Sequence, residues 1–401
     1  MLEGLDQIDW HQLQHAYGEA DDVPGWLRDL LVPHEERAYA PLDLLSISLC
    51  HQGTVYSATA HTVPFLLELL KSEEIQGREA ILLLLASIAK GDAYHRQHLD
   101  FYPEARRQDP EFQRELAEQI EWVERTREAA RQGLPIYLEL LSHPDPKIRM
   151  AAAYTLASFK GEASSIVPML LPRLEREDDV LARASMILSL GILGSHTHEV
   201  LALLKALLHT SHKEQTEQEL IHLATATALA WIGQEKTPQQ AVEILVHVLT
   251  SPRSDSLFDL YVQLPWVDGS LARFAGRTLR WRLPRERLRF AISRLMEALE
   301  IVDNYDVGEV IKILLYIVFG RQAFPEPRTV HDLNEEQREV LSVIARSYAA
   351  WHTPPGVYSM MGTYSAPGSE GDASAMMVIN DDVQALGLPG VQSELLRFLE
   401  Q

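Results

Sequence analysis

The chain has 401 residues, of which 46% are hydrophobic and 23% charged, so it is long enough for more than one ordinary globular core. Its 57 acidic and 36 basic residues leave a formal net charge of −21. This charge argues against a dedicated nucleic-acid-binding protein, because such binding depends on neutralising phosphates, and it favours association with a basic protein partner.

Cys50 is the only cysteine, which excludes an internal disulfide and a cysteine-rich zinc site. The acidic residues Glu3, Asp6 and Asp9 near the start are unlike a secretory signal. No run of about 18 apolar residues is present, so we expect no membrane span. The sequence therefore predicts a protein of the reducing cytoplasm.

The first ninety residues predict short helices and then one helical hairpin. We expect two short helices within 7–31 and another helix over 34–50. The phrase His51-Gln-Gly-Thr-Val-Tyr56 combines a glycine with β-branched residues, which predicts a turn with Gly53 at positive φ. Residues 59–91 are expected to form a pair of helices.

Residues 92–132 predict a charged helical insertion. Phe112, Leu116, Ile120 and Val123 recur at the spacing of one side of an amphipathic helix. Insertions into repeat proteins usually project on one face, and that face is often the binding face.

Residues 134–195 contain the same pattern twice. Pro135 and Pro168 are 33 residues apart, as are Gly161 and Gly194. A fixed period of this size predicts stacked helical hairpins. Each proline suits the first turn of a helix, and each glycine suits the left-handed conformation that ends one.

More helices are expected downstream, at 197–234, 238–283, 284–320 and 334–351. Residues 353–381 have the proline and glycine content of an irregular loop. Residues 382–401 are expected to form a C-terminal capping helix. The predicted fold is all-α, a right-handed α-α solenoid of helical hairpins over residues 1–352.

The repeated stretch resembles a HEAT repeat in its Asp145-Pro146 turn, in Arg149 a few residues later and in a second helix rich in small residues. Other phrases resemble a family of bacterial HEAT-repeat proteins of unassigned function: His15-Ala-Tyr-Gly18, Asp22-Val-Pro24, His51 to Thr59, Val63-Pro-Phe-Leu66, Leu264-Pro-Trp266 and Gly387-Leu-Pro389. This resemblance implies a solenoid fold and indicates no reaction.

A basic residue recurs at one position of the second helices. The residues at this position are Arg78, Arg149, Arg183, His222 and Arg273. We expect a structural ladder, in which the arginines pair with an aspartate of an adjacent turn, such as Asp145 or Asp179. The alternative is an anion-binding stripe along the inner surface of the solenoid.

The sequence offers little for catalysis. His11 and His15, and likewise His95 and His98, are spaced to share a helix face, but no third metal ligand has a signature. Neighbouring residues on a helix point about 100° apart, so Cys50 and His51 are not expected to form a nucleophile and base. We expect no catalytic residue, no cofactor and no metal.

The stretch from Arg273 to Arg294 contains eight arginines and one acidic residue, Glu286. On a helix, three of the arginines fall on one face, while Phe274 and Trp281 fall on another. One interpretation is a solvated helix face. The other is a docking patch for phosphate or an acidic partner, because arginine binds such groups through two hydrogen bonds. The candidate partner-binding residues are Arg273, Arg277, Arg280 and Arg282.

Together these features predict a non-catalytic binding scaffold that presents a concave helical surface to a protein or peptide partner. An immunity or antitoxin-like protein is one version of this prediction. The alternative is an enzyme, or a module that binds nucleic acid or phosphate, built on the same HEAT-like stack and using the Arg273–Arg294 patch.

Overall fold

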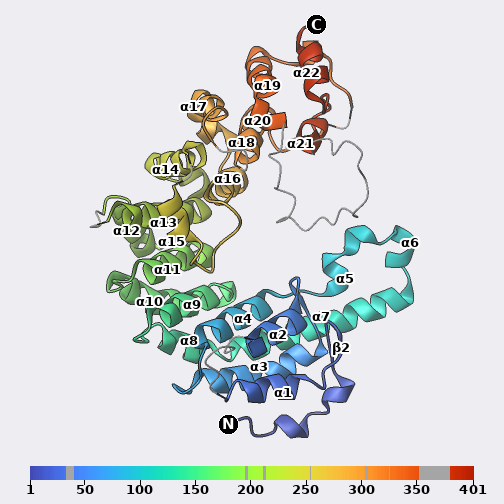
Figure 1. The fold of residues 1–401 in the computed structure, drawn as a ribbon, viewed down its shortest axis with the longest axis vertical. Coiled ribbons are helices and arrows are strands. Elements are labelled where there is room, and N and C mark those ends of the chain that lie inside the picture. Colours follow the sequence, from blue (N-terminus) through green and yellow to red (C-terminus); the bar gives the residue numbers. More distant parts are fainter. Residues whose placement is uncertain are drawn as a thin grey trace. The chain divides into compact units, whose positions relative to one another are not determined.

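The structure of the chain is a computed structural model, and it describes residues 1–32, 40–194, 197–210, 214–252, 254–302, 306–324, 326–351 and 380–401. By its internal contacts the chain divides into two units. Unit 1 comprises Met1–Ser195 and Leu264–Trp266, and unit 2 comprises His196–Gln263 and Val267–Gln401. Both units are built from α-helices, and the described strands form two short hairpins (Figure 1). The predicted all-α solenoid of helical hairpins is confirmed.

Unit 1 contains stacked hairpins, in which α4, α9 and α11 lie side by side in that order and α8 and α10 pack against α9 and α11. The helices are α1 (Val23–Asp29), α2 (Ala40–Leu49), α3 (Ser57–Leu70), α4 (Arg78–Lys90), α5 (Tyr94–Gln97), α6 (Glu104–Arg107), α7 (Pro110–Arg131), α8 (Leu134–Leu140), α9 (Pro146–Leu156), α10 (Ala163–Glu175) and α11 (Val180–Leu193). The strands are β1 (Gln14–His15), β2 (Gly18–Glu19), β3 (Cys50–His51) and β4 (Thr54–Val55).

The sequence determines where the repeated helices begin and end. The side chain of Asp145 accepts a hydrogen bond from the amide of Lys147 and caps α9, and Asp179 caps α11 in the same way. Gly194 ends α11 in the left-handed conformation, with a φ of 67°. Pro135 stands in the first turn of α8 as predicted, whereas Pro168, also expected in a first helical turn, lies inside α10 (Ala163–Glu175).

Small hydroxyl side chains let the inner helices approach closely. The Thr155 hydroxyl in α9 donates to the carbonyl of Leu82 in α4 at 2.9 Å. The Ser189 hydroxyl in α11 donates to the carbonyl of Ala153 in α9 at 2.7 Å. Because both hydroxyls are fully buried, these bonds satisfy polar groups that burial would otherwise penalise.

The N-terminal segment differs from the prediction of two short helices within 7–31. The structure has α1 there, preceded by short 3₁₀ turns and the antiparallel β1–β2 hairpin, in which Gln14 pairs with Glu19. The imidazole of His15 is buried, and its Nε2 lies 3.0 Å from Asp22 Oδ1. The helix expected over 34–50 begins at Ala40 and ends at Leu49, and residues 33–39 lie outside the described part of the chain.

The predicted turn at 51–56 is part of the β3–β4 hairpin. Gln52 and Gly53 form its tip, with φ values of 49° and 83°, so the predicted positive φ of Gly53 is confirmed. The hairpin is held by the start of the insertion, because the amide of Asp92 donates to the carbonyl of Gly53 at 2.8 Å. The Gln97 side chain donates to the same carbonyl at 2.7 Å.

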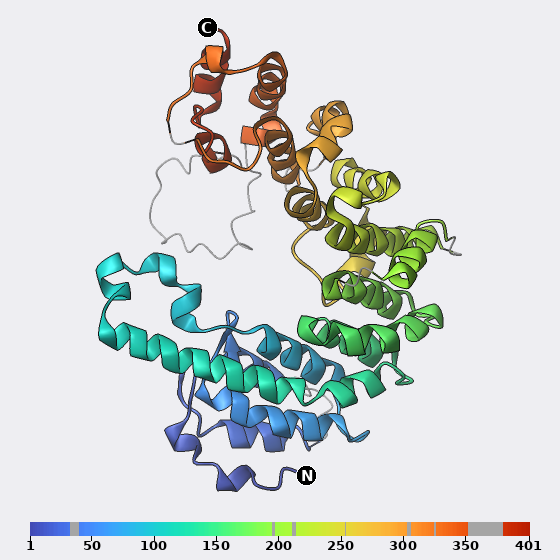
Figure 2. The same ribbon diagram turned by 180° about the vertical axis from the view of Figure 1, so that it is seen from behind.

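The insertion comprises α5, α6 and the long helix α7, which packs against α3 and α4 (Figure 2). Phe112 and Val123 are fully buried. Leu116 and Ile120 are partly buried against the cluster of Val55, Ala93 and Val123. The predicted apolar side of this helix is therefore confirmed, and it packs against Val55 of β4 and Ala93 at the start of the insertion.

Unit 2 continues as a second stack, in which α13, α14, α16, α18 and α19 contact one another in chain order and α22 packs against α19. Its helices are α12 (His198–Leu207), α13 (Gln215–Gly233), α14 (Gln239–Thr250), α15 (Asp255–Tyr261), α16 (Leu271–Arg282), α17 (Ile292–Ala298), α18 (Val307–Phe319), α19 (Glu335–Arg346), α20 (Tyr348–Trp351), α21 (Asn380–Gln384) and α22 (Gln392–Leu399). Of the loop predicted at 353–381, residues 353–379 lie outside the described part of the chain.

The segment Leu264–Trp266 lies between α15 and α16 in the sequence but belongs to unit 1 by its contacts. The indole Nε1 of Trp266 donates to the Ser185 hydroxyl at 3.0 Å. The edge of its ring faces Tyr154, with ring centroids 4.8 Å apart. A short segment from the middle of the chain therefore packs against α9 and α11.

Candidate functional site

The ladder position of α9 is a satisfied ion pair. Arg149 donates from Nε and Nη2 to the two carboxylate oxygens of Glu177, both at 2.7 Å, and from Nη1 to the carbonyls of His143 and Pro144 at 2.8 Å. The hydrogen bond to Glu177 raises the pKa of Arg149. The prediction that this arginine pairs with Asp145 or Asp179 is wrong, because both aspartates cap their own helices.

The other ladder residues have different surroundings. Arg78 is 5% exposed, and its Nη1 lies 3.0 Å from Glu73 Oε2. Arg183 has a buried Nε without a hydrogen-bond partner among the described residues. The Nε2 of His222 lies 3.2 Å from the carbonyl of Thr210. The ladder position therefore holds a basic side chain whose partners differ from one repeat to the next.

The arginine stretch of unit 2 is mostly paired inside the molecule. Arg273 and Arg277 both bind the carboxylate of Asp268, which lies just before α16. Partners of four more arginines are also within the chain: Arg285 with Glu286, Arg287 with the carbonyls of Glu235 and Thr237, Arg289 with Glu336 and Arg294 with His247. These contacts favour the interpretation of a solvated, ion-paired face for most of the stretch.

Arg280 and Arg282, at the end of α16, differ from their neighbours, because neither has a carboxylate partner within the described part of the chain. Trp281 lies between them and is 58% exposed, although the helical pattern placed it with the buried Phe274. The helix ends at Arg282, so Trp281 lies in its last turn.

A third arginine that the sequence analysis did not select joins this group. Arg321 follows α18, and its Nε donates to the carbonyl of Arg280 at 3.1 Å. Its guanidinium carbon lies 5.5 Å from the centre of the Trp281 ring and 5.0 Å from that of Tyr316. We call Arg280, Trp281, Arg282 and Arg321 the Trp281 patch. It is the candidate functional site.

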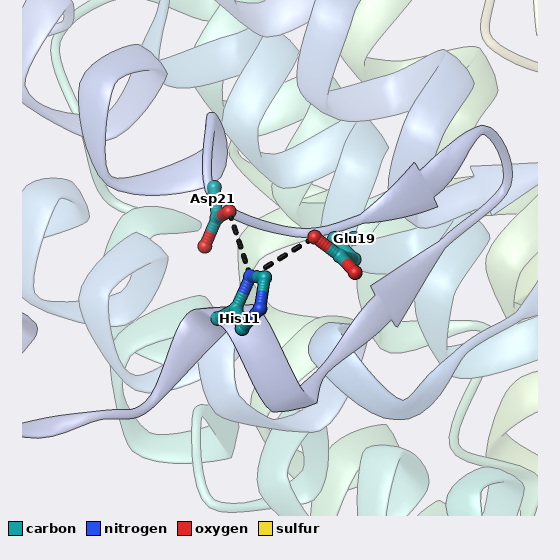
Figure 3. Close-up of side chains that lie close together, drawn as sticks. All are labelled: His11, Glu19 and Asp21. Atoms are coloured by element: carbon teal, nitrogen blue, oxygen red, sulfur yellow. Dashed lines mark hydrogen bonds and ion pairs between the residues drawn. The ribbon is translucent and has the colours of Figure 1, made fainter.

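Neither histidine pair converges on a metal site. His15 binds Asp22, whereas His11 Nδ1 lies 2.9 Å from Glu19 Oε2 and 3.2 Å from Asp21 Oδ2 (Figure 3). Among the described residues, these last three are the group whose donor atoms come within 4.8 Å of one another. The hydrogen bond to Asp21 and the charge of Glu19 raise the pKa of His11. An exposed ion pair of a protonated imidazole with two carboxylates accounts for this arrangement.

The other histidine pair is also divided, because His95 Nε2 lies 2.9 Å from Glu115 while His98 Nδ1 lies 2.8 Å from the carbonyl of Tyr94. Cys50 and His51 lie in β3, not in a helix as expected, and side chains that follow each other in a strand point to opposite faces. Burial raises the pKa of Cys50 to about 11.

Comparison with known sequences identifies the repeat. Residues 139–223, which span α9 and α11 with their ladder positions, match the family described as HEAT repeats. The chain contains HEAT repeats.

Two solved structures are similar to this chain. An engineered protein is 16% identical, with 81% of this chain and 88% of that chain covered and a TM-score of 0.33. A mutant of Kap121p is 16% identical, with a TM-score of 0.35, and the match covers 80% of this chain but only 35% of Kap121p. No curated protein matches the chain. Among the described helices, none is both long and apolar enough to cross a membrane.

Proposed function

We propose that this HEAT-repeat protein is a non-catalytic scaffold that binds a protein or peptide partner, and that the Trp281 patch is a contact surface for that partner. The observation that carries the proposal is the exposed Trp281 ring, which is flanked by the guanidinium groups of Arg280 and Arg321, each with its central carbon 5.5 Å from the ring centre.

Tryptophan and arginine supply much of the binding energy at protein interfaces, because they combine a large apolar area with fixed hydrogen-bond donors. More than half of the surface of Trp281 is exposed, whereas Trp10 and Trp351 are almost fully buried. Covering the ring with a partner would therefore remove apolar surface from water. A cytoplasmic location fits the proposal, since the single cysteine requires no oxidising compartment.

A variant of the patch tests the proposal against a matched control. Phe290 is 52% exposed and lies in the same arginine-rich stretch, so Phe290→Ala removes a similar aromatic ring outside the patch. The wild-type protein, Trp281→Ala and Phe290→Ala are each immobilised and exposed to extract of the native cell. Proteins held by the wild type are then purified and their affinities measured by calorimetry.

The proposal requires a partner that binds the wild type and Phe290→Ala alike and that binds Trp281→Ala at least tenfold more weakly. If each purified partner binds all three proteins equally, the Trp281 patch is not the contact surface.

A further inference from the structure

A small cavity lies beside the Trp281 patch, inside unit 2. Its volume is about 100 Å³, and its charged lining residues are Arg280, Lys312, Arg321 and Asp382. Arg280 comes from α16, Lys312 from α18, Arg321 from the segment after α18 and Asp382 from α21. The cavity therefore collects three cations and one carboxylate from four parts of the chain.

Arg321 is held in one orientation at the edge of this cavity. Its Nε and Nη2 both donate to the carbonyl of Arg280, and its guanidinium contacts the rings of Trp281 and Tyr316. The Tyr316 hydroxyl donates to the carbonyl of Leu283 at 2.7 Å, which fixes that ring in turn. Two of the three nitrogens of Arg321 are used in this way, and Nη1 has no acceptor in the described part of the chain.

The contact with the Arg280 carbonyl explains why an arginine stands at position 321, because a cation at the end of a helix satisfies its last carbonyls and dipole. The same explanation does not cover the Arg280 guanidinium. It makes no hydrogen bond to a carbonyl or carboxylate among the described residues, and its Nε is buried without a partner there.

The charges around the cavity do not balance. Glu309 lies 3.0 Å from Lys312 and neutralises it, and among the described lining residues Asp382 supplies the one carboxylate beside Arg280 and Arg321. Both guanidinium groups line the cavity, and each lies 5.5 Å from the centre of the Trp281 ring. An oxyanion in contact with both arginines compensates their positive charge and accepts charge-assisted hydrogen bonds.

We infer that this cavity binds an oxyanion carried by a peptide segment of the partner, with Arg280 and Arg321 as the donors and Trp281 in contact with the neighbouring part of the peptide. The inference rests on the proposed function and adds the chemistry of the partner. A carboxylate and a phosphate share this chemistry, since both accept two hydrogen bonds from a guanidinium.

Three fluorescein-labelled peptides of equal length test the inference: one of eight glutamates, one of eight glutamines and one of glycine and serine with two phosphoserines. Fluorescence anisotropy is measured at low and at moderate salt. We expect the glutamate or the phosphoserine peptide to bind in a manner that weakens with salt, and the glutamine peptide to bind at least tenfold more weakly. The tighter of the two anionic peptides identifies the source of the oxyanion.

Arg280→Gln is the informative variant, because the Arg280 guanidinium donates no hydrogen bond to another described group and its contact within the chain is with the exposed Trp281 ring. Arg277→Gln is its control, since Arg277 lies on the same helix and its charge is neutralised by Asp268. We expect Arg280→Gln to weaken binding of the anionic peptide at least tenfold and Arg277→Gln to weaken it less than twofold.

Equal binding by wild type and Arg280→Gln, or no binding of either anionic peptide, would overturn the inference. Such a result leaves the proposed function testable on its own, because partner binding that depends on Trp281 but not on Arg280 would support the scaffold without the oxyanion site.

Discussion

Arg149 donates two hydrogen bonds of 2.7 Å to the carboxylate of Glu177, a buried side chain 28 residues further along the chain. Removing the arginine leaves the carboxylate buried with the amide of Asp179 as its remaining donor, at 3.0 Å. We expect Arg149→Ala to lower the free energy of unfolding by about 3 kcal/mol or more, as when one partner of a buried ion pair is removed. Urea denaturation followed by circular dichroism measures the change.

The double variant Arg149→Met, Glu177→Leu distinguishes the pair from simple loss of packing. Because it removes both charges, we expect it to be more stable than Arg149→Ala. Arg285→Ala is the control, since its ion pair with Glu286 is exposed and is expected to change stability by less than about 1 kcal/mol. Equal stability of Arg149→Ala and the control would contradict the structural role of the pair.

Gly53 is expected to tolerate no branched side chain. Its φ of 83° disfavours any residue with a Cβ, and a Cβ there would lie 3.1 Å from Nε2 of Gln97. Gly53→Val should lower the free energy of unfolding by about 1–3 kcal/mol. Gly161→Ala is the matched control, because its Cβ would meet no atom within 4 Å, and a melting temperature lowered equally by both variants would refute this explanation.

Cys50 is expected to react slowly with thiol reagents. Burial raises its pKa from the ordinary 9.0 to about 11, so the thiolate fraction of the folded protein at pH 8 is on the order of one in a thousand. We expect reaction with an aromatic disulfide reagent at pH 8 to be at least tenfold slower in the folded protein than in urea. The raised pKa also means that this group stabilises the fold below pH 9 and that the contribution is lost as the pH rises towards 11. Equal rates in both states would show that the thiol is accessible.

His11 is expected to titrate above the ordinary imidazole value. Its hydrogen bond with Asp21 and the charge of Glu19 raise its pKa above 6.5, so protonation stabilises the folded state. That contribution is complete below pH 6.5 and is lost as the pH rises through the folded value. The titration is followed by NMR of the ring protons. Asp21→Asn should move the His11 pKa down, and a pKa unchanged by that variant would show that the ion pair does not form in solution.

Trp266 is expected to stabilise α9 and α11. Trp266→Ala removes a ring that packs against Tyr154 and a hydrogen bond to Ser185, and because the ring is only half-buried we expect a loss of about 2–3 kcal/mol. Hydrogen exchange should become faster in the amides of both helices. Trp281→Ala is the control, since that exposed ring should leave exchange in unit 1 unchanged. Unchanged exchange in both variants would exclude a stabilising role for Trp266.

The repeated helices could be predicted because their signals are local. Asp145 and Asp179 stand directly before the helices that they cap, and the glycine that ends α11 lies at its expected position. The two short β-hairpins could not be separated from turns, because strands of two residues have no period to recognise. The partner of Arg149 was misassigned for a related reason. Asp179 is used by the backbone of its own helix, and the side chain that reaches the arginine is Glu177, two residues earlier.

The candidate site could be predicted only in part. Arg280 and Arg282 were found because arginines are dense in that stretch, but the density itself was misleading, since most of the neighbouring arginines have partners that lie elsewhere in the sequence. Arg321 was missed because it follows a different helix and meets Arg280 only through the stacking of α16 on α18. The exposure of Trp281 depends on where α16 ends, which periodicity does not fix.

The position of Trp266 in the chain has a consequence for how the protein is made. Its hydrogen bond to Ser185 spans 81 residues, so α9 and α11 leave the ribosome well before the tryptophan that covers them. At the usual speed of translation that interval is about 4–16 s, long compared with the formation of a helical hairpin. During this time the Ser185 hydroxyl and the Tyr154 ring lack their Trp266 contacts, so the first part of the stack is synthesised before the residue that completes its packing.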